Sequence, residues 1–419
     1  MILILFCIVF SVSILLSRKI DRFFIIVFSA SVAYFCILGY WYWTAIRNFE
    51  FLGVYWFDML PRAREILVIY SMVVIFSAAC FSRLSPTKHI ESHHLFPTTT
   101  FNAIVSLGVA GALYVLYGSI SYGGLNPDDT LALLIGQFAD VLTPCLIFSI
   151  AWRGWTKSNA IAVVLFVSFA VFVGFRTRIV LVCGPLLYLF WADSNFGRGT
   201  ARRKLLVIAS GIFILLLFSV MTFSREKFNA VNFDQISNAN FTDMLDGFFG
   251  ESNIIFGLIG VLTEFVDVGF FIWLQPILDS FIEFIPRYFY PEKSTGDYLV
   301  IAVRGLLASN AVESGTAYPF VGEFLIMGGH PFALVLSIFI GFIVVHFRKV
   351  IENSTSNESL LNAGIGIISV FFGYYYYSRG YIPQMFKLFI FSVLPYYILL
   401  KQSRISSVKN YNIRDYTYV

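Results

Sequence analysis

Two arginines lie inside a long apolar run, where their charges need partners. The stretch FVGFRTRIVLV at 172–182 contains Arg176 and Arg178, and residues 159–192 contain no other charged side chain. A charge inside a membrane segment is costly and therefore usually functional. Because a guanidinium pairs with phosphate oxygens and keeps its charge, both arginines are candidates to bind a phosphate-bearing substrate. The alternative is that they extend to lipid headgroups.

A second candidate group lies late in the chain, in VRGLLASNAVESGTAYPFVGEFLIMGGHP at 303–331. Its glycines and prolines predict a turning backbone that can approach a ligand closely. Arg304 is a further candidate to bind an anion. A carboxylate or imidazole near a hydroxyl can act as a general base, so Glu323 is the first candidate base and His330 the second. Glu323 could instead form a salt bridge that orders the loop.

The tyrosine-rich run GYYYYSRGYIP at 373–383 allows two interpretations. Tyr377 and Arg379 could form a rim on which a sugar ring stacks. Alternatively, the run is an aromatic belt at the membrane interface.

Two further polar groups are weaker candidates. The run HIESHH at 89–94 gives His89 and His93 a spacing that zinc could use, but the loop falls on the face opposite the other candidates, so no metal site is predicted. Asp140 lies inside an apolar segment with Gln137 and Thr143. It is interpreted as the buried partner of an arginine, with a transport site as the alternative.

The composition places these residues in a membrane protein. Of the 419 residues, 58% are hydrophobic and 13% are charged, whereas soluble domains have about 25% charged residues. The five cysteines lie in apolar segments without a Cys-x-x-Cys pair, which indicates buried thiols rather than a disulfide or metal framework. The N-terminus is expected to be a retained first span rather than a signal peptide.

Long apolar runs predict an all-α polytopic membrane protein with about eleven transmembrane helices. The predicted spans are 1–17, 23–43, 65–82, 101–118, 131–151, 159–175, 179–192, 205–223, 332–347, 360–377 and 383–400. They define an N-terminal bundle at 1–223, a large outer or periplasmic loop at 224–331 with short interfacial or re-entrant helices, and a C-terminal part at 332–419.

The distribution of lysine and arginine predicts the orientation. Basic loops such as RKIDR, RGTARRK and HFRKV fall on one side if the N-terminus is outside and the C-terminus is cytoplasmic. Residues 159–192 then form a hairpin with Arg176 and Arg178 at its outward-facing apex. The longest inner loop, 83–100, is too short for a nucleotide-binding domain, so any substrate should arrive already activated.

With these features, the chain resembles the Wzy-type polymerases that join oligosaccharide repeat units of bacterial surface polysaccharides. The resemblance rests on the aromatic-rich spans, GFRTR at 174–178, the long late outer loop, and GTAYPFVGEFLIMGG at 315–329. The spacing of Arg304 and Gly315 also fits an Arg-x10-Gly pattern described for some of these enzymes, although one such match is expected by chance.

The resemblance implies a metal-independent glycosyltransferase without a cofactor, located in the bacterial cytoplasmic (inner) membrane. Such enzymes transfer a growing glycan from undecaprenyl pyrophosphate onto the next lipid-linked unit at the outer face, which builds O-antigen, as in lipopolysaccharide, or capsule. The implied partners are undecaprenyl-pyrophosphate-linked oligosaccharide, membrane lipid and a chain-length regulator protein, with no nucleic acid. Arginines would stabilise the pyrophosphate leaving group as its charge develops.

Two other functions remain open at this stage. A glycan ligase would use the same class of lipid-linked donor and the same outward arginines. A flippase or secondary transporter for lipid-linked oligosaccharide is the alternative from a different class. Transporters commonly contain internal repeats, which this sequence does not display.

Overall fold

The protein is described here by a computed structural model, and the description covers most of the chain. The described residues are 2–46, 59–84, 95–122, 135–173, 176–192, 205, 209–211, 240–249, 254–285, 290, 298, 301, 318–378 and 381–414. Within these ranges the regular structure is helical and includes no strand. An all-helical arrangement suits a membrane, because a helix satisfies its own backbone hydrogen bonds in hydrocarbon.

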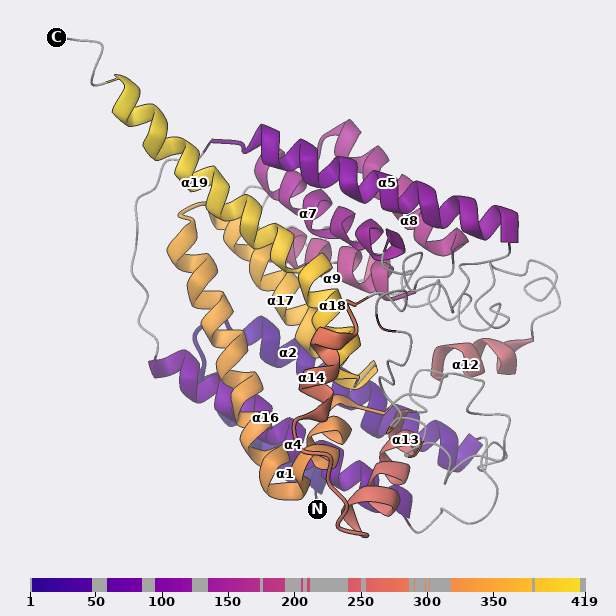
Figure 1. The fold of residues 1–419 in the computed structure, drawn as a ribbon. Coiled ribbons are helices and arrows are strands. Elements are labelled where there is room, and N and C mark those ends of the chain that lie inside the picture. Colours follow the sequence, from indigo (N-terminus) through magenta and orange to yellow (C-terminus); the bar gives the residue numbers. More distant parts are fainter. Residues whose placement is uncertain are drawn as a thin grey trace. The chain divides into compact units, whose positions relative to one another are not determined.

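The helices follow the apolar runs of the sequence (Figure 1). In chain order they are α1 (Ile2–Leu16), α2 (Arg22–Val32), η1 (Ala33–Leu38), α3 (Gly39–Trp41), η2 (Tyr42–Ile46), α4 (Met59–Leu84), α5 (Thr98–Tyr122), η4 (Phe138–Val141), α7 (Leu142–Arg153), α8 (Lys157–Phe172), α9 (Arg176–Ala192), α12 (Phe241–Phe249), α13 (Ile254–Val261), η7 (Leu262–Val266), α14 (Gln275–Ile282), α16 (Phe320–Ser354), α17 (Glu358–Ser378), α18 (Ile382–Ser392) and α19 (Leu394–Arg414). The segments η1, η2 and η7 are π-helical, and η4 is a 3-10 helix.

Seven helices among the described residues are long and apolar enough to cross a membrane, or eight if one broken pair counts as a span. The seven are Arg22–Ile46, Met59–Leu84, Thr98–Ser119, Ile135–Arg153, Phe320–Ser354, Glu358–Ser378 and Ile382–Arg404. Three shorter apolar helices, Ile2–Leu16, Lys157–Phe172 and Arg178–Ala192, lie at three more of the predicted spans. The predicted span 205–223 falls almost wholly outside the described residues, so the count of eleven crossings stays a prediction.

The helix α16 consists of two helices that meet at a break, where Gly328 and Gly329 leave the helical conformation. The first of them carries Glu323 in its first turn and falls inside the predicted outer segment 224–331. The second coincides with the predicted span 332–347.

The chain divides into two compact units. Unit 1 comprises Met1–Ser85, Phe249–His346 and Ser369–Lys387, and unit 2 comprises Pro86–Phe248, Phe347–Ile368 and Leu388–Val419. Each unit therefore combines segments from early and late in the chain, whereas the predicted division followed the order of the sequence.

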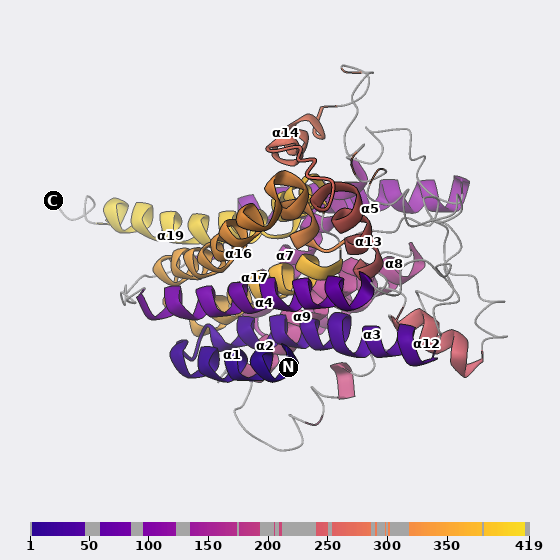
Figure 2. The same ribbon diagram turned by 90° about the horizontal axis from the view of Figure 1, so that it is seen from below.

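Unit 1 is built around α4. This helix contacts α1, α2 and α13, and Figure 2 shows α1, α2 and α4 side by side. Phe28 of α2 and Phe35 of η1 pack against Tyr377 of α17, with ring centroids 5.2 and 5.4 Å from that of the tyrosine. The Tyr377 hydroxyl lies 2.6 Å from Ser71 Oγ on α4. The core between these helices therefore consists of packed aromatic rings and one hydrogen bond, between Tyr377 and Ser71.

Gly341 allows α16 to approach α4 closely. A Cβ atom at this position would lie 2.1 Å from Ser77 Oγ and 2.7 Å from the Ala78 nitrogen. Small residues are typical where membrane helices approach each other.

We expect Gly341→Val to destabilise unit 1 by about 1–3 kcal/mol, because the backbone atoms of α4 must move aside. Unfolding in detergent would measure the loss. Gly211→Ala is the control, since its nearest neighbour is Leu187 Cδ1 at 3.9 Å. Equal stability of the two variants would contradict the close approach.

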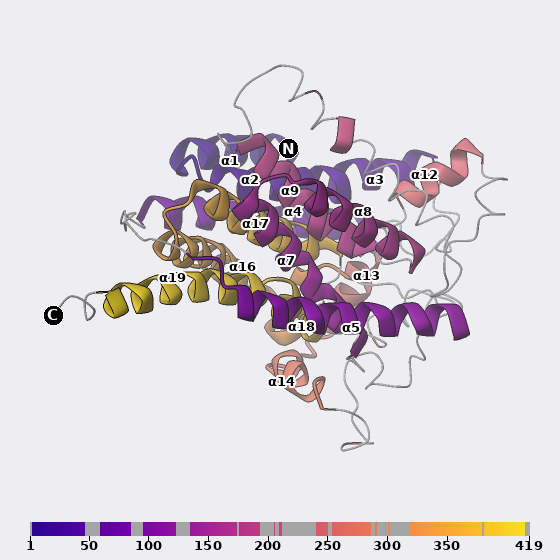
Figure 3. The same cartoon turned by 90° about the horizontal axis from the view of Figure 1, so that it is seen from above.

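Unit 2 is centred on α7, which contacts α5, α8, α9 and α19 (Figure 3). The turn from α7 to α8 is fixed by Asn159, whose side chain donates to the Gly154 carbonyl at 2.9 Å and accepts from Ser149 Oγ at 2.9 Å. Gly154 has φ +74°, a conformation that glycine adopts readily. On α5, a Cβ at Gly111 would lie 2.7 Å from the Ala139 nitrogen. The missing side chain lets η4, which carries Asp140, lie against α5.

Candidate functional site

The candidate site in unit 1 begins at a break inside α16. Gly328 and Gly329 leave the helical conformation, and Gly329 has φ +67° and ψ −159°. A Cβ at Gly329 would lie 3.1 Å from the Phe271 ring, and the Ile272 N–H donates to the Ile326 carbonyl at 3.1 Å. A carbonyl near the end of the first half-helix therefore accepts a hydrogen bond from a backbone N–H outside the helix. The second half starts at His330 and Pro331, a residue suited to the first turn of a helix.

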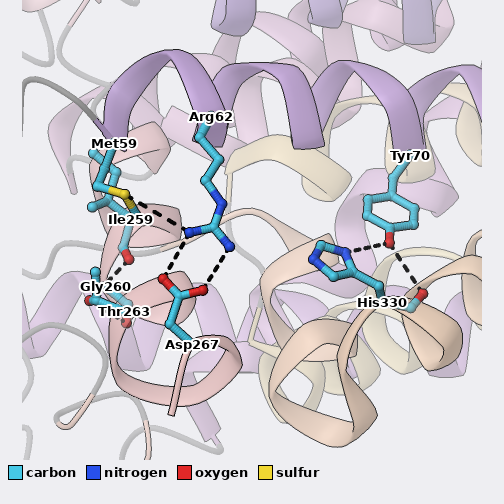
Figure 4. Close-up of polar contacts among 8 residues, drawn as sticks. All are labelled: Met59, Arg62, Tyr70, Ile259, Gly260, Thr263, Asp267 and His330. Carbon is cyan, nitrogen blue, oxygen red and sulfur yellow. Dashed lines mark hydrogen bonds and ion pairs between the residues drawn. The ribbon is translucent and has the colours of Figure 1, made fainter. Parts of the chain in front are cut away.

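His330 is exposed at this break and is held by α4. The Tyr70 hydroxyl lies 2.9 Å from His330 Nδ1 and donates to the His330 carbonyl oxygen at 3.1 Å (Figure 4). The two rings are nearly parallel, with an interplanar angle of 13°. Tyr70 itself is buried. A rigid side chain on a membrane helix thus orients an exposed imidazole.

These two contacts favour one arrangement of the hydrogens on His330. A tyrosine hydroxyl has one proton and can also accept a hydrogen bond. If that proton is donated to the carbonyl, the contact with the imidazole is a hydrogen bond only when Nδ1–H is the donor. The neutral ring then has its free lone pair on Nε2, which makes Nε2 the basic nitrogen.

A charged pair lies beside the imidazole. Arg62 of α4 donates from both terminal nitrogens to Asp267, at 2.8 and 2.7 Å (Figure 4). Asp267 follows the π-helical segment η7, and its N–H donates to the Leu262 carbonyl at 2.8 Å. Both side chains are 40% exposed. Asp267, an acidic residue in an otherwise apolar run, therefore accepts two parallel hydrogen bonds from one guanidinium.

The pKa of Asp267 lies below its ordinary value of 3.8. The hydrogen bond from Arg62 is the main cause, burial opposes it, and the electrostatic contributions of Arg62 and of His330 lower the pKa further. Because this pKa is lower in the folded than in the unfolded chain, the pair stabilises the fold above the ordinary pKa. That contribution is lost as pH falls through the lowered value.

We therefore expect Arg62→Gln to cost about 0.2–1 kcal/mol at neutral pH, the range for exposed pairs, and less in acid. Thermal unfolding of both proteins over a pH series would measure this. A difference in stability that does not change with pH would contradict the proposed contribution of the pair.

Glu323, the first candidate base, is enclosed by protein. Its side chain is fully buried, and the Tyr318 hydroxyl donates to Oε1 at 2.9 Å. Burial raises the pKa of Tyr298 and of Tyr318, and the charge of Glu323 raises each further. Asp279 of α14 is also close enough to act electrostatically on Tyr298. Because Glu323 is fully buried and His330 is exposed, Glu323 is less suited to be the base than His330.

In unit 2, Arg178 is engaged within the protein. Its Nε donates to Asp140 Oδ1, and its Nη2 donates to the Gly136 carbonyl at 3.2 Å. Arg178 and Asp140 have side chains only 6% and 5% exposed. The prediction that Asp140 is the buried partner of an arginine is therefore confirmed. That Arg178 lies at the outward-facing end of a hairpin stays a prediction.

The remaining predicted binding residues divide into two groups. Tyr377 is fully buried, with Phe28 and Phe35 against its ring, so it has no free face for a sugar in this structure. Arg176 begins α9, but its side chain lies outside what the structure describes, as do Arg304 and Arg379. Their binding roles stay predictions. Among the described residues, no group of three His, Cys, Asp or Glu could hold a metal ion; His89 and His93 are not among them.

The sequence pointed to His330 but missed Tyr70 and Arg62. Arg62 could have been noticed, because PRARE at 61–65 places charges at the start of an apolar helix. Tyr70 gave no signal, since one tyrosine in an apolar run is ordinary in a membrane helix.

The fold and composition define the class of this protein: it is a multi-pass α-helical membrane protein. No protein-family model, no curated protein and no solved structure matches the chain. Its function is therefore argued from its own residues.

Proposed function

We propose that this protein polymerises undecaprenyl-pyrophosphate-linked oligosaccharide repeat units into surface polysaccharide, as a metal-independent glycosyltransferase. The observation that carries the proposal is the exposed His330, whose Nδ1 and carbonyl oxygen lie 2.9 and 3.1 Å from the Tyr70 hydroxyl, an arrangement that favours Nε2 as the basic nitrogen. A base placed at a break in a membrane helix suits a reaction on a lipid-borne substrate.

The proposed reaction needs one proton acceptor and stabilisation of one leaving group. His330 Nε2 takes the proton of the acceptor sugar's hydroxyl, and that oxygen attacks the anomeric carbon of the donor glycan. The bond from this carbon to the pyrophosphate oxygen breaks, and undecaprenyl pyrophosphate leaves with the electron pair. Arginines stabilise such phosphate charge well, and Arg176, Arg304 and Arg379 are the candidates.

The proposal includes a topology. Eleven crossings, with the N-terminus outside and the C-terminus cytoplasmic, would place residues 224–331 at the outer face of the bacterial inner membrane, where lipid-linked units are joined. The bias of lysine and arginine toward the opposite loops supports this orientation. A chain-length regulator is the proposed protein partner.

Deleting the gene and separating the surface glycans on a gel tests the polymerase proposal. We expect the ladder to collapse to one repeat unit on its final carrier, and plasmid-borne wild-type protein to restore it. If the single unit is also lost from the surface, the missing step is ligation or transport, and polymerase is the wrong assignment.

A transporter of lipid-linked oligosaccharide is the second candidate. The observation that favours it is the interrupted helix α16 with the buried Glu323 in its first half, because broken helices and buried charges are common in transporters. The same deletion separates the two functions, since loss of a transporter would leave lipid-linked units at the inner face.

Tyr70 is proposed as a positioning residue for His330. Without the hydroxyl, the imidazole loses one hydrogen bond, worth about 0.5–1.5 kcal/mol. We therefore expect Tyr70→Phe to reduce kcat by roughly tenfold with little change in KM, measured with purified protein and lipid-linked units.

Nitrogen NMR of labelled histidine gives a second readout for Tyr70→Phe. We expect this variant to lose the His330 tautomer that carries its proton on Nδ1. Tyr117→Phe is the matched control, because Tyr117 is 61% exposed on α5. An unchanged tautomer in Tyr70→Phe would contradict the positioning role even if activity fell.

A further inference from the structure

The chain that follows η7 and includes α14 exposes many large apolar side chains. Residues 268–285 belong to unit 1 and lie outside the candidate spans. Eight large apolar side chains in this stretch are between 38% and 71% exposed: Val268, Phe270, Trp273, Leu274, Ile277, Leu278, Phe281 and Ile285. Such a large exposed apolar patch indicates a contact with lipid or protein.

The acidic and hydroxyl side chains of α14 point the other way. Asp279 and Ser280 are 1% and 3% exposed, and Gln275 Nε2 donates to Asp279 Oδ1 at 2.7 Å. Glu283 accepts from Lys387 Nζ of α18 at 2.5 Å. The helix α14 (Figures 1 and 2) thus buries Asp279 and Ser280. Its outward side chains are Ile277, Leu278 and Phe281, together with Gln275 at its first position.

This distribution is the reverse of that of a surface helix in water, which buries its apolar face. In water, the exposed leucine and phenylalanine side chains would lose the favourable transfer out of solvent. In hydrocarbon the same arrangement is favoured, because polar groups must find partners inside the protein. The orientation of α14 therefore identifies its surroundings as apolar.

The stretch cannot cross the membrane by itself. The eight residues of α14 span about 12 Å, against about 30 Å of hydrocarbon. The chain turns before it, at Gly269 with φ +74° and at Trp273 with φ +51°. A segment of this length and shape can enter only part of a bilayer.

We propose that residues 268–285 are immersed in the bilayer, with the exposed face of α14 against lipid acyl chains. The surface is continuous with a lipid-facing one: Phe271 and Ile272 contact the break of α16, and the second half of α16 exposes Leu334, Val335 and Phe339. The immersed segment thus begins at the same break that carries His330. Membrane immersion does not depend on the proposed enzyme activity.

Spin labelling of the full chain in lipid nanodiscs tests this inference. In a cysteine-free background, Leu278→Cys carries the label and Val335→Cys is the lipid-facing control. Ser158→Cys, in the exposed first turn of α8, is the aqueous control. We expect Leu278→Cys to resemble Val335→Cys, with high access to oxygen and low access to a water-soluble nickel chelate.

Either of two results would overturn the inference. Nickel access as high as at Ser158→Cys would place α14 in water, and low access to both reagents would show that protein covers it. Trp273, which is 66% exposed, gives a check without labels. Brominated lipids should quench wild-type fluorescence more than that of Trp273→Phe, and equal quenching would contradict immersion.

Discussion

Replacing His330 with alanine should reduce polymer formation by about 10²–10⁴-fold, the usual contribution of a general base. The imidazole is the proton acceptor that we propose; it is exposed at the break of α16, and its Nδ1 lies 2.9 Å from the Tyr70 hydroxyl. Purified protein in nanodiscs, supplied with lipid-linked repeat units, would give the rate. In cells, the glycan ladder should collapse to the single unit seen on deletion.

His346→Ala is the matched control. His346 is the last residue of α16 that belongs to unit 1, and its ring stacks on Phe342 rather than on Tyr70. It should retain the full ladder. Glu323→Gln tests the competing assignment, since it keeps a partner for Tyr318 and removes the carboxylate. If this folded variant loses all activity while His330→Ala retains it, Glu323 is the base and our assignment is reversed.

Removing one partner of the Arg178–Asp140 pair should destabilise the protein by about 3–5 kcal/mol, because the other charge is left buried without compensation. Both side chains are at most 6% exposed, and Arg178 also donates to the Gly136 carbonyl at 3.2 Å. Unfolding in detergent of Arg178→Met and of Asp140→Leu would measure the cost, and both variants should also reach the membrane in lower amount.

The double variant distinguishes a pair from two separate residues. If the ion pair is the reason for both losses, Arg178→Met with Asp140→Leu should cost clearly less than the two single losses added together, since no unpaired charge remains. Additive losses would contradict the coupling. A variant that folds normally yet stops polymerisation would instead restore the substrate-binding role predicted for Arg178.

The two arginines of FRTR illustrate how far the sequence could determine the site. Their position predicted a role for charge inside the membrane, and the interpretation of Asp140 as a buried partner was confirmed. Which arginine Asp140 binds could not be predicted, because residues 140 and 178 are brought together by the packing of α7 against α9. A buried ion pair and a phosphate site look alike in sequence, since both place an arginine in an apolar run.

The run GGHP at 328–331 illustrates the same limit for the proposed catalytic residues. Glycine and proline predicted a turning backbone, and α16 breaks at Gly328 and Gly329. The order of the two candidate bases depended on burial, which the sequence does not contain. Glu323 is enclosed beside Tyr318, whereas His330 is exposed and held by a tyrosine 260 positions earlier in the chain.

The sequence by itself determined the class of the protein and the place of most of its helices. Hydrophobicity over a span's length is a local property, and a helix in lipid satisfies its backbone without help from distant residues. Only the tertiary structure decided which charges are paired, which tyrosines are buried and which face of α14 points outward. These depend on contacts between residues far apart in the chain, and such contacts arise only when the helices assemble.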